Sequence, residues 1–113
     1  MDNHSIRVDK PWGFKDILVE TPNYTVSRLH IEANERLSLQ IHSIKVETLI
    51  VENNYCLILK GKNTKRYSQG DFEHIPSQTV HRVEALDVAC DIIEVATLAG
   101  DEVKRLSDDY GRK

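Results

Sequence analysis

Short apolar runs alternate with clusters of turn-forming residues along almost the whole chain. The runs are rich in Val, Ile, Leu, Tyr and Thr, as β-strands are, and the clusters between them contain the Asn, Gly, Pro, Asp and Ser typical of turns. Before Ala96 no segment has a helical period, and only residues 100–106 suggest a helical turn or two. The pattern predicts nine strands, at residues 14–19, 24–31, 37–42, 48–51, 55–59, 65–67, 73–75, 79–84 and 88–95.

This number of short strands predicts an all-β domain closed into a jelly-roll barrel. One flat sheet seldom carries so many strands, and closure removes the exposed edges. The 113 residues contain no repeat, linker or low-complexity segment, and they suffice for one core but not for two. We therefore expect one domain over residues 1–113, with the barrel interior as its main pocket.

Charge and composition exclude several classes of function. The formal net charge of -3 argues against nucleic-acid binding, which needs a basic surface to neutralise phosphates. No apolar run approaches the ~20 residues of a membrane helix, and residues 1–7 lack the apolar stretch of a signal peptide. We expect a cytoplasmic protein that binds neither nucleic acid nor a membrane. Cys56 and Cys90 lie in apolar runs, so we expect buried free thiols.

Polar side chains share one face of the predicted strand at residues 37–42. Because side chains alternate in a strand, the apolar residues 37, 39 and 41 face one way, and Gln40 and His42 face the other. Glu47 opens the next apolar run, and His81 lies inside a later one. Each of these residues alone is more often structural than functional. Grouped, two imidazoles and a carboxylate form a recurrent ligand set for first-row divalent metals.

The sequence thus predicts a site for one divalent metal ion, formed by Gln40, His42, Glu47 and His81. The amide oxygen of glutamine is a weak neutral ligand that would complete the stronger three. Zinc is the ion we expect, with manganese, iron, cobalt and nickel as alternatives.

Two segments of the chain resemble the two motifs of the cupin superfamily. Residues 35–42 with Glu47 resemble the first motif, with glutamine in place of its first histidine, and Gly70 through Pro76 to His81 resemble the second. More specifically, the chain is similar to the C-terminal domain of type II mannose-6-phosphate isomerase/mannose-1-phosphate guanylyltransferase enzymes. The matching pieces follow the family's order over nearly the whole chain: residues 10–13, 37–40, 75–76, 81–84, 93–95 and 108–112.

This resemblance implies interconversion of a phosphorylated aldose and ketose, such as mannose 6-phosphate and fructose 6-phosphate. A metal would act as a Lewis acid on the sugar oxygens, and cationic side chains would hold the phosphate. We expect Lys45 and Arg105 to be catalytic, and both to bind substrate together with Arg112. Each has a plainer interpretation: Lys45 as a solvated loop residue, Arg105 as a surface ion pair, and Arg112 as part of a disordered end.

The chain departs from the family where its activity is decided. Lys45 stands in place of an arginine implicated in isomerase activity, and lysine lacks the bidentate fork of arginine. We therefore expect altered or weakened isomerase activity, and no guanylyl transfer, because no segment matches the nucleotidyltransferase domain. Glu84 and His74 are candidate bases. Trp12 should close a barrel end or cover a neighbouring subunit, and we expect a homodimer.

Two other functions fit the same residues. One is a non-catalytic cupin that binds a sugar or nucleotide sugar in polysaccharide metabolism. The other is a different metal enzyme, such as an oxygenase or a lyase, because two histidines and a carboxylate also suit Fe(II).

Overall fold

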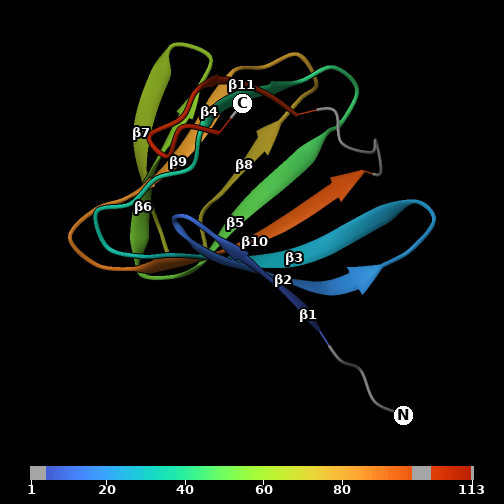
Figure 1. The fold of residues 1–113 in the computed structure, drawn as a ribbon, viewed down its shortest axis with the longest axis horizontal. Coiled ribbons are helices and arrows are strands. Elements are labelled where there is room, and N and C mark those ends of the chain that lie inside the picture. The colour runs from blue at the N-terminus through green and yellow to red at the C-terminus, as the bar shows by residue number, and fades with distance from the viewer. Residues whose placement is uncertain (1–4, 98–102, 113) are drawn as a thin grey trace.

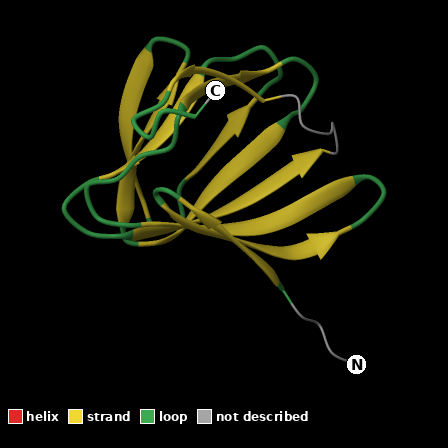
Figure 2. Cartoon of the chain, in the orientation of Figure 1, coloured by secondary structure: helices red, strands yellow, loops and turns green. Residues whose placement is uncertain are grey.

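Two antiparallel sheets face each other across the interior of the molecule (Figures 1 and 2). The computed structural model describes residues 5–97 and 103–112. Within these residues, one sheet has the order β1 (Ile6–Lys10), β2 (Gly13–Glu20), β3 (Tyr24–Ile31), β10 (Cys90–Thr97), β5 (Glu47–Asn53), β8 (Phe72–Ile75). The other has the order β11 (Val103–Ser107), β4 (Leu39–His42), β9 (His81–Ala85), β6 (Tyr55–Lys60), β7 (Asn63–Ser68). No helix in the described part of the chain could cross a membrane.

The predicted strands are all present, with ends displaced by up to a few residues. Residues 24–31 form β3 as predicted, whereas the run at 37–42 becomes regular only at Leu39. Leu37 therefore does not follow the expected alternation: it is buried and lines the interior cavity. Apolar alternation locates strand interiors, but hydrogen bonding to neighbouring strands decides where they begin.

Two strands near the ends of the chain, β1 and β11, were not predicted from the sequence. β1 pairs with β2, and β11 pairs with β4. The expectation of a helical turn at residues 100–106 is wrong for 103–106, which belong to β11, while 100–102 lie outside the described residues. Neither strand is a continuous apolar run, so only pairing with a neighbour stabilises it.

Alternating side chains of both sheets form the core. Buried and half-buried positions alternate along all of β9, and along β5 and β10 up to their exposed last residues. Leu49, Ile58 and Ile92 are almost fully buried. Fully burying such a side chain contributes about 1.5–3 kcal/mol. Cys56 and Cys90 are buried free thiols, as predicted.

Trp12 and Gly13 fix the start of β2 against β3. Trp12 is only 4% exposed and packs in the core cluster, so its own chain covers it, as expected of a side chain that closes a barrel. Gly13 has φ of 153°, and a Cβ there would lie 1.9 Å from the carbonyl oxygen of His30. Only glycine permits this backbone approach.

Gly13→Ala should therefore destabilise the fold strongly, because the backbone of β3 would have to move. Gly61→Ala is the matched control, since Gly61 also has a positive φ of 65° but no atom lies within 4 Å of its added Cβ. We expect about 1 kcal/mol of lost stability for Gly61→Ala and at least about 2 kcal/mol more for Gly13→Ala in urea denaturation. Equal losses in the two variants would show that the close approach is not a constraint.

Residues 108–112 are anchored to the domain rather than disordered. The backbone amide of Arg112 donates to Oδ2 of Asp108 at 2.7 Å, and its guanidinium donates to both carboxylate oxygens at 2.8 and 3.1 Å. The Tyr110 hydroxyl donates to the Glu35 carboxylate, and Arg36 pairs with Asp109 at 2.7 Å. The last two contacts attach the segment after β11 to the loop that precedes β4.

The Asp108–Arg112 contact predicts a stability that depends on pH. Hydrogen bonding from Arg112 lowers the pKa of Asp108 to about 2, from an ordinary value of 3.8. A carboxylate whose pKa is lower in the folded state stabilises it above about pH 4 and loses that contribution as the pH falls toward 2. We expect Asp108→Asn to cost about 1–3 kcal/mol at pH 7 and almost nothing at pH 2. Urea denaturation across this range tests the prediction, with the exposed Asp9→Asn as control; a cost independent of pH would contradict it.

Candidate metal centre

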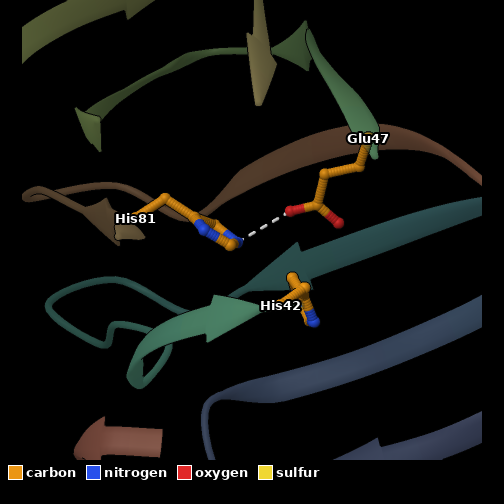
Figure 3. Close-up of side chains that lie close together, drawn as sticks. All are labelled: His42, Glu47 and His81. Atoms are coloured by element: carbon orange, nitrogen blue, oxygen red, sulfur yellow. Dashed lines mark ion pairs between the residues drawn. The ribbon is translucent and has the colours of Figure 1, made fainter. Parts of the chain in front are cut away.

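Three buried side chains from three strands converge inside the barrel (Figure 3). His42 is the last residue of β4, Glu47 is the first of β5, and His81 is the first of β9. Their candidate ligand atoms all lie within 4.8 Å of one another, and the ring centroids of the two histidines are 5.2 Å apart. The structure thus brings together three of the four residues predicted from the sequence as ligands.

Gln40 lies beside this cluster. It pairs with His81 across β4 and β9, is half-buried and lines the same cavity. Residues that face each other across an antiparallel pair project to the same side of the sheet. Its position is therefore compatible with the predicted role, and coordination by its amide oxygen stays a prediction.

A backbone contact fixes the orientation of the His81 ring. Nδ1 lies 2.9 Å from the carbonyl oxygen of Thr79, and because a carbonyl only accepts, Nδ1 carries the proton and donates it. The other nitrogen, Nε2, lies 2.8 Å from Oε1 of Glu47, and Figure 3 shows the two groups pointing toward each other. In a neutral ring, Nε2 presents a lone pair to a carboxylate. Such a contact is favourable only with a positive charge on the ring or a cation between the two groups.

Glu47 is held in its charged form. Burial by itself raises the pKa of this carboxyl, but the hydrogen bond to His81 and the positive charges of His81 and Lys45 outweigh it and bring the pKa to about 2. The ammonium of Lys45 lies 3.6 Å from Oε2. An ionised carboxylate is the form that binds a metal ion, so this carboxylate is ready to act as a ligand.

The donor set fits a divalent metal ion. Two imidazoles and one carboxylate suit zinc and other first-row divalent ions, and the hydrogen bond from Nδ1 of His81 to a backbone carbonyl is typical of ligating histidines. Ligands about 2.1 Å from one ion lie at most about 4.2 Å apart, so binding would require only a small contraction of the 4.8 Å cluster. His42, Glu47 and His81 could therefore bind a metal ion.

A second buried carboxylate lies next to the cluster, and the sequence analysis missed it. Glu94, on β10, lines the cavity, and its Oε1 lies 3.4 Å from the ammonium of Lys15. Burial raises the pKa of Glu94, and the nearby charge of Glu47 raises it further. The sequence did contain a sign of its burial, because strand alternation places Glu94 on the same face as the apolar Cys90, Ile92 and Ala96. The structure shows that these three residues are buried.

The two candidate bases taken from the sequence lie elsewhere. Glu84 accepts a hydrogen bond from Arg36 at 3.2 Å, and His74 is an exposed residue of β8 whose Nδ1 lies 3.2 Å from the Thr48 hydroxyl. Neither side chain lines the cavity above the cluster. The structure therefore separates both residues from the candidate metal centre.

The cluster forms part of the wall of a cavity of about 290 Å³, which is small for a ligand site. Lys45, Arg105 and Arg112, predicted from the sequence to contact substrate, all line this cavity. Lys10 and Lys15 line it too, and the sequence analysis did not single them out. Five cationic side chains thus share one cavity with the candidate metal ligands, although their roles toward a substrate stay predictions.

Replacing one of the three convergent residues should abolish metal retention. We expect His42→Ala and His81→Ala to weaken zinc binding at least about 100-fold, because each removes one of few ligands. His30→Ala and His74→Ala serve as controls, since these histidines do not line the cavity. Elemental analysis after dialysis and competition with a zinc-binding dye measure the effect, and circular dichroism checks the fold. The site is refuted if the unchanged protein retains none of zinc, manganese, iron, cobalt or nickel.

The sequence matches the family model described as mannose-6-phosphate isomerase C-terminal over residues 1–108. The alginate biosynthesis protein AlgA of Pseudomonas aeruginosa is 31% identical over 114 residues, which cover 97% of this chain and 23% of AlgA. A mannose-1-phosphate guanylyltransferase of Salmonella muenchen is 27% identical over 110 residues, covering 94% of this chain and 23% of the relative. The chain thus spans about a quarter of the length of these relatives.

Solved structures share the fold at low sequence identity. The capsular polysaccharide assembling protein CapF of Staphylococcus aureus superimposes with a TM-score of 0.80 at 16% identity, covering 91% of this chain and 34% of CapF. KdgF of Halomonas sp. superimposes with a TM-score of 0.76 at 17% identity, covering 89% of this chain and 97% of KdgF. A cupin-2 domain of Rhodospirillum rubrum superimposes with a TM-score of 0.79 at 11% identity, covering 91% of this chain and 74% of that protein. These likenesses concern the fold alone, and they confirm the predicted cupin jelly-roll barrel.

Proposed function

Because the chain belongs to the mannose-6-phosphate isomerase C-terminal family, we propose that it is a metal-dependent isomerase that interconverts mannose 6-phosphate and fructose 6-phosphate. One observation carries the proposal: a buried His–Glu–His cluster shares a small cavity with five cationic side chains. A metal ion and a cationic wall are the two elements that a phosphorylated sugar requires, one for its hydroxyl and carbonyl oxygens and one for its phosphate.

The metal ligands in this proposal are His42, Glu47 and His81, with Gln40 as a fourth, and zinc as the ion. A bound ion would act as a Lewis acid toward the sugar oxygens. The protein's own groups would do the rest: Lys45 stays next to the ligand carboxylate of Glu47, and the other cations bind substrate. Homodimer formation and a cytoplasmic location stay predictions.

Proton transfer in the proposed reaction falls to Glu94. Isomerisation moves a proton between neighbouring carbons, so a base must lie within hydrogen-bond reach of the bound sugar. Of the described residues that line the cavity, Glu94 is the carboxylate outside the ligand set. The Lys15 ammonium, 3.4 Å away, holds it in place.

A non-catalytic role is the second candidate, and the position of Lys45 favours it. This lysine occupies the place of a family arginine and pairs with Glu47 at 3.6 Å. A lysine committed to the ligand carboxylate does not offer the planar fork that an arginine would offer to a substrate. The same cavity would then bind a sugar phosphate without converting it.

The test is turnover by the metal-loaded chain. We expect conversion of mannose 6-phosphate to fructose 6-phosphate, loss of conversion on chelation, and recovery on adding metal back. Glu94→Gln should lower kcat about 10²–10⁴-fold while metal content is unchanged, and Glu84→Gln, which alters a carboxylate outside the cavity, should keep kcat. NMR of the sugar anomers measures the conversion rate in both variants and in the unchanged chain.

The outcomes separate the candidate functions. No conversion with any of the five metals, together with a rise in Tm on adding mannose 6-phosphate, would replace the isomerase with a binding protein. Oxygen consumption by the Fe(II)-loaded chain with a small organic acid would instead favour an oxygenase. Full activity in Glu94→Gln would remove Glu94 from the proton transfer.

A further inference from the structure

Lys10 is a cation in the cavity wall that comes from a part of the chain distant from the metal ligands. It is the last residue of β1, pairs with Gly13 across the turn to β2, and is half-buried. Its side chain lines the cavity together with Arg105 of β11 and Arg112 of the anchored C-terminal segment. One segment near the N-terminus and two near the C-terminus therefore bring cationic side chains to the same cavity.

Most cations of this cavity have a carboxylate partner. Lys15 pairs with Glu94 at 3.4 Å, Lys45 with Glu47 at 3.6 Å, and Arg112 with Asp108 at 2.8 Å. Lys10 differs: none of residues 5–97 and 103–112 places a carboxylate within ion-pair distance of its ammonium. The carboxylate of Glu94 acts on Lys10 only beyond ion-pair distance, and it is itself paired with Lys15.

The surroundings of Lys10 make its charge costly in the ligand-free protein. Burial lowers the pKa of Lys10 below its ordinary value, and the positive charges of Lys15, Arg112 and Arg105 lower it further. The negative charge of Glu94 opposes these effects but does not outweigh them. A half-buried ammonium among other cations destabilises the fold unless an anion offsets the repulsion. Groups placed at such a cost are characteristic of binding sites.

We propose that Lys10 binds the phosphate group of the substrate, together with Arg105 and Arg112. This inference rests on the proposed function and deepens it, because it moves phosphate recognition away from Lys45 to the N-terminal hairpin and the C-terminal segment. A phosphate monoester offers three terminal oxygens, which the Lys10 ammonium and the two guanidinium groups can share. Arg112 would contribute the N–H groups that it does not donate to Asp108. The cavity of about 290 Å³ suits a sugar monophosphate better than a bulkier nucleotide sugar.

The experiment measures binding of two probes, inorganic phosphate and mannose 6-phosphate, to the metal-loaded full chain by calorimetry. The variants are Lys10→Met, which keeps side-chain length without charge, Lys10→Arg, Lys45→Met, and Lys62→Met as a control at an exposed lysine far from the cavity. We expect Lys10→Met to weaken the binding of both probes at least about 10-fold, the loss of affinity typical of one charge-assisted contact. Lys10→Arg should retain most of the affinity, Lys45→Met should lose less, and Lys62→Met should match the unchanged protein.

Thermal denaturation without ligand distinguishes binding from a structural role. If Lys10 is placed for an anion, Lys10→Met should have a Tm equal to or above that of the unchanged protein, because one source of repulsion is gone. A lysine needed for folding would instead lower the Tm. Zinc content should be the same in Lys10→Met, Lys10→Arg and Lys62→Met, so that a loss of phosphate binding in Lys10→Met cannot come from loss of the metal.

Several results would overturn the inference. They are unchanged phosphate affinity in Lys10→Met, a larger loss in Lys45→Met than in Lys10→Met, or no binding of either probe to the unchanged metal-loaded chain. The proposed function can fail separately: if mannose 6-phosphate binds through Lys10 but is not converted, the isomerase proposal is wrong and the phosphate site stands.

Discussion

The contact between Glu47 and His81 is the constraint on which the rest of the site depends. A carboxylate and an imidazole nitrogen meet at 2.8 Å in a place where both side chains are almost fully buried. Burying charge is costly unless other charges or hydrogen bonds compensate for it. The Thr79 carbonyl orients the His81 ring, and the charge of Lys45 offsets part of the charge of the Glu47 carboxylate. His42 adds a third candidate metal-ligand atom. A metal ion could satisfy the same groups together.

The cationic wall has a different structural origin from the ligand cluster. The candidate ligands lie on β4, β5 and β9, whereas Lys10 and Arg112 come from the two ends of the chain. Their positions depend on features that carry no charge chemistry of their own: the close approach of Gly13 to β3 and the burial of Trp12. On the other side, Asp108 holds Arg112 and Arg36 holds Asp109. Residues that look structural therefore determine where an anion could bind.

Membership of the family and likeness of fold support different statements. The family match covers residues 1–108 and establishes the type of domain, while solved structures at 11–17% identity establish only the jelly-roll barrel. Cupin-like barrels support unrelated activities, so function has to come from the residues in the cavity. Here those residues include Lys45, paired with Glu47, and a buried carboxylate, Glu94, whose pKa is raised by burial. The chemistry proposed for this chain therefore rests on its own cavity.

The sequence by itself determined the strand interiors and three convergent candidate ligands, because alternation along a strand is a local property of the chain. It placed His42, Glu47 and His81 in strands whose neighbours are apolar, and all three proved to be buried together. It did not reveal β1, β11, the register of Leu37, or the placing of Glu84 and His74 outside the cavity. Tertiary structure decided these, because they follow from which strands pair and which ends of the chain fold back. Lys10, Lys15, Arg105 and Arg112 share a cavity only after that long-range pairing has formed.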